Sequence, residues 1–183
     1  MSFLFIYFTL TAIFGVFAVC YCFDFMIAAM TKTSPEVASG KELRNIVVSE
    51  INKNYKNLHS VIDIGSCWGG LARKIARECP GKNVVAVERM PSPAFISTIK
   101  DLFSFCNSKT IWGEAIKYIK KSNGFDIGTA YLYPDMMKKL EKHLNKFKVL
   151  IVLDFPLPNT KPTRTQKLHH DHLGQHNLYI YEN

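Results

Sequence analysis

A glycine-rich turn between a short apolar strand and a helix is the segment of this sequence most able to bind a ligand. It reads Asp63-Ile64-Gly65-Ser66-Cys67-Trp68-Gly69-Gly70. Glycines at such a turn let the backbone approach a ligand closely, and the helix that follows begins with free N–H groups. Asp63 ends the strand and places a carboxylate where the phosphate of a dinucleotide would be repelled. The turn therefore favours a ligand with a cationic group.

A second acid extends the expected site. Glu88 follows the next strand, 19 residues after Gly69, and an acid at this point can accept hydrogen bonds from both hydroxyls of a ribose. The alternative for Glu88 is a solvated carboxylate at the end of a strand. Glu114 follows the third strand, where it could bind an adenine amine, although an acid at a helix start is an equally simple interpretation.

These residues fit S-adenosylmethionine, whose amino-acid end carries an ammonium group. The predicted cofactor-binding residues are Asp63, Gly65, Ser66, Cys67, Gly69, Glu88 and Glu114.

Alternating strands and helices from residue 60 onwards position these side chains. The expected strands cover residues 60–64, 84–87, 110–112, 125–132 and 148–153, and the expected helices cover 71–78, 94–105 and 114–121. Pro134 opens a further helix whose apolar positions continue to Phe147. Residues 163–168 and 176–181 are expected to form a hairpin. Repeated strand–helix units predict an α/β fold, a Rossmann-like sheet with helices on both faces.

The N-terminal part of the chain is apolar and uncharged. Residues 3–23 contain no charged side chain, and as a helix they would span roughly 31 Å, about the thickness of a bilayer core. The uncharged start, Met1-Ser2, disfavours a cleaved signal peptide. All 23 Lys and Arg residues lie beyond this run, and Lys32, Lys41 and Arg44 follow it closely. The positive-inside rule predicts a single-pass membrane protein with its N-terminus outside and its domain on the cytoplasmic side, or the equivalent side of an organelle.

Three segments are therefore expected: a transmembrane anchor over 1–30, a linker and leading helix over 31–58, and a Rossmann-like S-adenosylmethionine-binding domain over 59–183. Ser34-Pro35 predicts the start of the leading helix, whose apolar residues include Leu43, Val47 and Ile51. Beyond the anchor, 23 basic and 14 acidic residues give a net charge of +9, which would draw the domain to anionic headgroups. Nucleic acid is not expected as a partner, because the basic residues are dispersed and no module of stacking aromatics accompanies them.

The cysteines and histidines indicate no metal site. Five cysteines show neither a paired framework nor zinc spacing, which fits a reducing compartment. His169, His170, His172 and His176 surround one turn, but side chains spread over a hairpin must converge before they bind a metal. We expect a polar loop near the membrane or the substrate instead.

The run from Asp63 to Glu88 resembles motif I and its acidic partner in the seven-strand S-adenosylmethionine-dependent methyltransferases. Residues 131–141, 154–158 and 178–181 (YLYPDMMKKLE, DFPLP and LYIY) are similar to a small membrane-anchored subfamily. That subfamily includes the mitochondrial lysine methyltransferases that act on the ATP synthase c-subunit and the adenine nucleotide translocase, with short prokaryotic relatives. This chain departs from the pattern at Cys67, where the family usually has its second glycine, and a side chain there is expected to crowd the cofactor.

The resemblance implies a membrane-anchored methyltransferase that modifies a lysine of a membrane protein. Tyr131 and Tyr133 are expected to end the fourth strand and Asp154 to end the fifth, at the carboxyl edge where such sheets bind ligands. We expect the tyrosines to hold the substrate amine and Asp154 to line the same mouth. For the tyrosines, core packing and capping of the next helix are the alternatives. Two other functions stay open: methylation of a lipid or small hydrophobic molecule, and a degenerate, non-catalytic module for interactions at the membrane.

Overall fold

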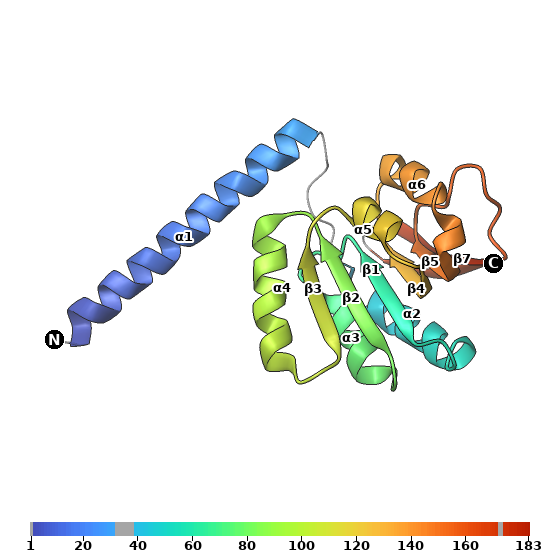
Figure 1. Ribbon diagram of the computed structural model, residues 1–183, viewed down its shortest axis with the longest axis horizontal. Coiled ribbons are helices and arrows are strands. Elements are labelled where there is room, and N and C mark those ends of the chain that lie inside the picture. The colour runs from blue at the N-terminus through green and yellow to red at the C-terminus, as the bar shows by residue number, and fades with distance from the viewer. Residues whose placement is uncertain (1, 32–38, 172–173) are drawn as a thin grey trace.

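The computed structural model describes residues 2–31, 39–171 and 174–183 of the chain (Figure 1). A long N-terminal helix, α1 (Ser2–Thr31), extends away from an α/β domain and contacts helix α4 (Pro91–Ser104). The termini lie far apart, because α1 carries the N-terminus away from the sheet.

Seven strands of the described chain form one sheet in the order β3-β2-β1-β4-β5-β7-β6. They are β1 (Ser60–Ile64), β2 (Asn83–Glu88), β3 (Ser108–Trp112), β4 (Phe125–Ala130), β5 (Phe147–Leu153), β6 (Arg164–Asp171) and β7 (Gly174–Glu182). The first five are parallel, and β7 is antiparallel to both β5 and β6. The chain order reverses at β1, between β2 and β4, and ligands bind such sheets at the carboxyl edge of this switch point.

Helices cover both faces of the sheet, as the alternation predicted. On one face, α2 (Lys41–Asn54) and α3 (Gly70–Glu78) contribute Ile51 and Ile75 to an apolar cluster. On the other face, α5 (Ala115–Lys121) and α6 (Pro134–Glu141) contribute Ile119 and Leu140 to a second cluster. All four of these side chains are fully buried.

The leading helix packs on the domain through the apolar face that its sequence indicated. Leu43, Val47 and Ile51 of α2 are all buried in the first cluster. The described helix begins at Lys41, after Gly40 in the N-cap position. The predicted start at Ser34-Pro35 lies outside the described residues.

Two boundaries beside strands β4 and β5 were predicted wrongly. The helix opened by Pro134 ends at Glu141 and is followed by a short 3-10 turn, η1 (Leu144–Lys146), while Phe147 begins β5. Phe147 is buried in the second cluster, and a buried strand residue has the same apolar character as a helix position, so spacing alone misplaced it. Strand β4 ends at Ala130 rather than at residue 132, which leaves Tyr131 in the loop.

The loop from β5 to β6 covers part of the second face without a helix. Its residue Leu157 is buried in the second cluster. The backbone N–H of Leu157 donates to Tyr181 Oη of β7 at 2.8 Å. The Phe-Pro-Leu-Pro segment of residues 155–158 therefore closes this side of the domain.

Helix α1 exposes most of the side chains described for it. Phe3, Phe5, Phe14 and Tyr21 are each more than two-thirds exposed. Within the described part of the chain, no helix combines the length and the apolar character that crossing a membrane requires. The transmembrane anchor at 1–30, its boundaries and its orientation stay predictions.

Candidate cofactor site

The glycine-rich turn lines a pocket at the carboxyl edge of β1. Three other segments complete it: the residues around the start of α2, the start of α3 and the loop after β4. The lining residues are Ser39, Arg44, Asp63, Gly65, Ser66, Cys67, Trp68, Gly70, Leu71 and Tyr131.

The turn requires glycine at two positions. Gly65 and Gly69 have φ angles of +71° and +67°, a region that glycine enters without steric cost. A Cβ on Gly65 would lie 2.6 Å from Leu132 Cδ2, and a Cβ on Gly69 would lie 2.6 Å from Arg73 Nη1. A side chain at either position would therefore combine a strained φ angle with a contact that Leu132 or Arg73 must shift to relieve.

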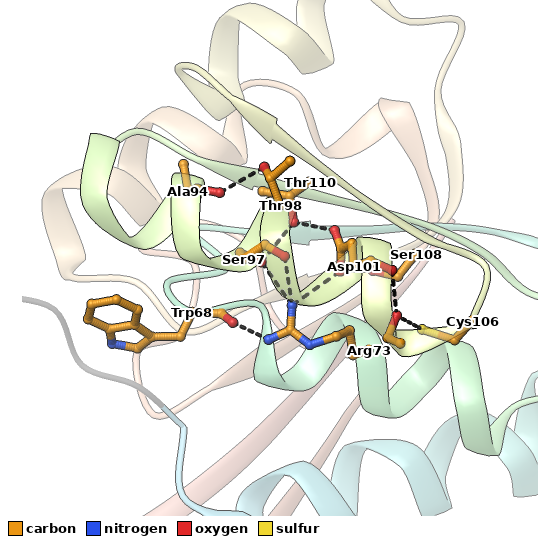
Figure 2. Close-up of polar contacts among 10 residues, drawn as sticks. Trp68, Arg73, Ala94, Ser97, Thr98, Asp101, Cys106, Ser108 and Thr110 are labelled. Atoms are coloured by element: carbon orange, nitrogen blue, oxygen red, sulfur yellow. Dashed lines mark hydrogen bonds and ion pairs between the residues drawn. The ribbon is translucent and has the colours of Figure 1, made fainter. Parts of the chain in front are cut away.

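A buried arginine holds the turn from behind (Figure 2). The Arg73 guanidinium donates to the carbonyl oxygen of Trp68, to Ser97 Oγ at 3.0 Å and to Asp101 Oδ1 at 3.1 Å. Asp101 in turn accepts a 2.6 Å hydrogen bond from Thr110 Oγ1 of β3. The turn is thereby tied to α4 and β3. Because the Arg73–Asp101 ion pair is almost fully buried, removing one partner alone would leave an uncompensated buried charge.

Asp63 is a buried carboxylate with one oxygen unpaired. Its Oδ1 accepts a hydrogen bond from Thr129 Oγ1 at 2.9 Å, whereas its Oδ2 has no hydrogen-bond partner. Ser66 Oγ, also buried, is likewise unpaired, and both residues line the pocket. Burial raises the pKa of Asp63 to about 6, against the opposing effects of the Thr129 hydrogen bond and of the nearby backbone N–H of Ala72. A cation bound in the pocket would supply the missing partner.

Cys67 and Glu88 meet at the back of the turn. Cys67 is buried with a φ of +51°, a left-handed conformation that costs a residue with a Cβ about 1 kcal/mol. Its N–H donates to Glu88 Oε2 at 2.8 Å, and Glu88 Oε1 accepts the N–H of Met90 at 2.7 Å. Glu88 is 7% exposed, so its interpretation as a solvated carboxylate is wrong. It lies beside the pocket rather than among the lining residues.

Of the residues predicted to bind adenine or hold the substrate amine, only Tyr131 lines the pocket. Glu114 occupies the N-cap position of α5 and forms an ion pair with Lys117 at 3.3 Å, away from the lining residues. Tyr133 occupies the N-cap position of α6, and its ring packs on Phe155 with centroids 6.0 Å apart. Tyr133 thus lies as the alternative prediction for the tyrosines had it, at the start of the next helix and packed on a neighbouring ring.

Asp154 is held by the neighbouring strand β7. Its φ is +62°, its Oδ2 accepts a hydrogen bond from His176 Nδ1 at 2.8 Å, and its Oδ1 accepts the N–H of Asn177 at 3.0 Å. Both carboxylate oxygens thus fix the path of the chain after β5. Asp154 is not among the residues that line the pocket.

The residues of the chain that the structure describes contain no group of His, Cys, Asp and Glu suited to a metal ion. The side chains of residues 169–175, where the histidine-rich turn was noted, lie outside the described set.

Arg44 and Ser39 were missed as pocket residues. Arg44 lies on α2, next to buried Leu43, and its guanidinium is close to Gly70 at the start of α3. In the sequence, Arg44 was interpreted only as one of the basic residues that orient the chain in a membrane. Arg44 lies beside the apolar face of the helix that precedes β1, and this face must pack near the switch point. Its place in the sequence could therefore have indicated that it lies near the pocket.

No known family model matches the sequence, and no curated protein does. Solved structures match over most of the domain. An RNA methyltransferase from Salinibacter ruber, in complex with S-adenosyl-L-homocysteine, aligns over 80% of this chain and 93% of its own at 19% identity, with a TM-score of 0.64. Precorrin-6y C5,15-methyltransferase from Geobacter metallireducens GS-15 aligns over 82% and 93% at 12% identity, with a TM-score of 0.63.

TrmK of M. capricolum, in complex with S-adenosyl-homocysteine, aligns over 74% of this chain and 67% of its own at 14% identity, with a TM-score of 0.60. At such identities the likeness concerns the fold. The chain has the Rossmann-like α/β fold of the class I S-adenosylmethionine-dependent methyltransferases.

The strain at Cys67 leads to a first prediction. Cys67→Gly removes the cost of the left-handed conformation but also loses the packing of a buried side chain, so in urea titrations it should lower the free energy of unfolding by about 1 kcal/mol less than the same exchange at a buried cysteine without this strain. The control is Cys79→Gly, because Cys79 is buried at a φ of −114°; there the same exchange loses packing and should destabilise. Equal destabilisation by both substitutions would contradict this account.

The raised pKa of Asp63 leads to a second prediction, which concerns how stability depends on pH. The folded state holds this proton up to about pH 6, whereas the ordinary pKa of an aspartate is 3.8, so the stability contributed by this group falls as pH rises through that window. Asp63→Asn removes the charge, and its amide oxygen can still accept from Thr129. We expect the variant to match the protein near pH 4 and to exceed its unfolding free energy by at most about 3 kcal/mol at pH 7.

The measurement is urea unfolding of both proteins at a series of pH values. Asp126→Asn is its control. Although burial raises the pKa of Asp126, hydrogen bonds from Lys148 and from the N–H groups of Ser60 and His59 lower it overall. Stability from Asp126 is therefore present at neutral pH and lost in acid, so this variant should be destabilised at pH 7. An Asp63→Asn protein that is also less stable at pH 7 would refute the assignment.

Proposed function

We propose that the pocket binds S-adenosylmethionine and that the protein is an S-adenosylmethionine-dependent methyltransferase. The observation that carries this proposal is the pair of unpaired buried atoms, Asp63 Oδ2 and Ser66 Oγ, in the pocket wall. Burying a carboxylate oxygen without a partner is costly. The ammonium group of the cofactor would pair with both atoms.

Arg44 supports the same ligand. The amino-acid end of the cofactor carries a carboxylate as well as an ammonium group, and Arg44 lines the pocket together with Asp63. Arginine binds carboxylates through two parallel hydrogen bonds. The two charges of the protein would therefore match the two charges of the ligand. Two structural neighbours, the Salinibacter ruber RNA methyltransferase and TrmK of M. capricolum, were solved in complex with S-adenosylhomocysteine, which adds support.

The acids after β2 and β3 would bind the nucleoside. Each oxygen of Glu88 accepts one backbone hydrogen bond and retains a further lone pair for a ribose hydroxyl. Glu114 would reach the adenine amine only after leaving Lys117, with which it forms an ion pair. Cys67 lies between Glu88 and the pocket and narrows the space for the ribose.

The cofactor supplies an electrophilic methyl group, and the residues of this chain would position the acceptor. Tyr131 lines the pocket, and the Tyr133–Phe155 pair stands at the same edge of the sheet with Tyr133 38% exposed. Tyrosine rings hold an amine by cation–π contact, and a partly apolar pocket favours its neutral, nucleophilic form. Asp154, fixed by His176 and Asn177, would position the loop that carries Phe155.

The substrate class rests on the sequence resemblance alone. A lysine of a membrane protein is the first candidate, and a lipid or small hydrophobic molecule is the second. A degenerate module without catalysis is the third. Cys67 separates the third from the other two, because it determines whether the cofactor fits.

We further propose that α1 holds the domain at a membrane as a single-pass anchor, with the N-terminus outside. Three features support this: α1 has 30 residues, its residues 3–23 carry no charge, and its described apolar side chains are exposed. The basic residues Lys32, Lys41 and Arg44 follow it, in keeping with a domain on the cytoplasmic side.

Calorimetry on the full chain in nanodiscs tests cofactor binding. Asp63→Asn and Arg44→Gln each remove one charged partner, so each should weaken S-adenosylmethionine binding by about 10-fold to 100-fold. Arg77→Gln, at an exposed position of α3, is the matched control and should bind like the unaltered protein. No heat with any of these proteins at millimolar ligand would refute the enzyme proposals and leave the non-catalytic module.

Flotation and mass spectrometry test the anchor and the substrate. The full chain should float with vesicles after carbonate extraction, because an apolar helix buried in lipid resists high pH and salt. Lysine methylation in the membrane proteome should fall when Asp63→Asn replaces the unaltered protein. A chain that stays at the bottom of the gradient contradicts the anchor, and unchanged lysine methylation contradicts the lysine substrate.

A further inference from the structure

The outward face of α4 is apolar. Phe95, Ile99, Leu102 and Phe103 are 57%, 39%, 73% and 74% exposed. Phe95, Leu102 and Phe103 each lie three or four residues from Ile99, which places the four on one side of the helix. Phe105, just past the end of the helix, is 99% exposed. Contiguous exposed apolar surface of this kind marks a contact with a protein or a membrane.

The inward face of the same helix consists of small residues, Ala94 and Ser97 among them, and carries no large apolar side chain. Ser97 is fully buried and, with Asp101, binds the guanidinium of Arg73 (Figure 2). An ordinary surface helix has the opposite arrangement, with its apolar side toward the core and its polar side toward water. In α4 the large apolar side chains are instead on the exposed side, as expected for a helix whose outer side contacts lipid.

Helix α1 lies against the same flank. The N–H of Ser92, near the start of α4, donates to Asp24 Oδ1 of α1 at 3.2 Å, and both residues are buried. Figure 1 shows α1 leaving the domain on the side of α4 and the edge strand β3. A layer that covers α1 near Asp24 would therefore also lie beside the start of α4.

The charges beside this face suit a lipid surface. Lys100 of α4 and Lys109 of β3 are exposed, and long basic side chains at the edge of an apolar surface reach the headgroup region. Trp112, at the end of β3, is 67% exposed, and tryptophan prefers the interface between lipid and water. Apolar residues flanked by lysines and an indole are typical of a helix that lies in the plane of a membrane surface.

We propose that the outward face of α4, formed by Phe95, Ile99, Leu102 and Phe103, lies in the interfacial layer of a lipid bilayer as a second membrane contact. This inference rests on the proposed anchoring through α1. The outward face of α4 adjoins α1 and is flanked by lysines, and both features favour lipid over a second copy of the chain as its partner. Because α4 begins three residues after β2 ends, two membrane contacts would fix the orientation of the carboxyl edge that holds the pocket.

Tryptophan quenching by brominated lipids tests this contact in the full chain. The sequence has only two tryptophans, so Trp68→Phe with Trp112→Phe gives a silent background. Phe103→Trp places a reporter on the proposed face, and Lys139→Trp, at an exposed position of α6 on the other face of the sheet, is the matched control. Both are read in vesicles of phosphatidylcholine and phosphatidylglycerol, with and without bromine on the acyl chains.

We expect bromine to lower the emission of the Phe103→Trp protein about twofold and to leave that of the Lys139→Trp protein unchanged. If both proteins float with the vesicles but neither is quenched, the α4 contact is overturned while the anchor stands. Cross-linked dimers without quenching would likewise overturn it, because a second copy then covers the face. If the chain does not float, the anchor and the α4 contact fall together.

Discussion

The pocket depends on a turn that the chain must hold in an unfavourable conformation. Gly65, Cys67 and Gly69 all have positive φ angles, and hydrogen bonds from behind hold them there. Arg73 binds the carbonyl oxygen of Trp68, and Glu88 accepts the N–H of Cys67. Because these partners come from α3 and β2, the turn is positioned by the sheet and its helices rather than by its own sequence. The strained turn after β1 therefore depends on the packing of α3 and β2 around it.

This arrangement places charge where it costs stability. Asp63 is buried, with one oxygen satisfied by Thr129 and the other by no group of the described chain. A well-packed domain gains nothing from such a carboxylate, and burial raises its pKa to about 6. This cost is explained if the pocket binds a cation, because the ligand then supplies the partner that Asp63 Oδ2 lacks in the folded chain. Arg44, facing the same pocket from α2, adds the complementary charge.

Much of this could be predicted from the sequence, and the failures have physical causes. Strand β1 has the predicted bounds because apolar residues end there at glycines. The wrong assignment of Phe147 arose because buried strand and helix positions look alike when read singly. Arg44 was not predicted to line the pocket, because its place depends on how α2 docks across the chain. Glu114 has the expected helix-start position, yet its side chain turns to Lys117, a choice that local sequence does not determine.

The central claim is that a cation pairs with Asp63, and the ionisation of this carboxyl reports on it directly. Carbon-13 NMR of labelled aspartate gives the Asp63 pKa with and without saturating S-adenosylmethionine. The account predicts a value near 6 in the free protein and a clear fall in the complex, because a nearby ammonium group favours the ionised form. A pKa that stays the same in the saturated complex would contradict it.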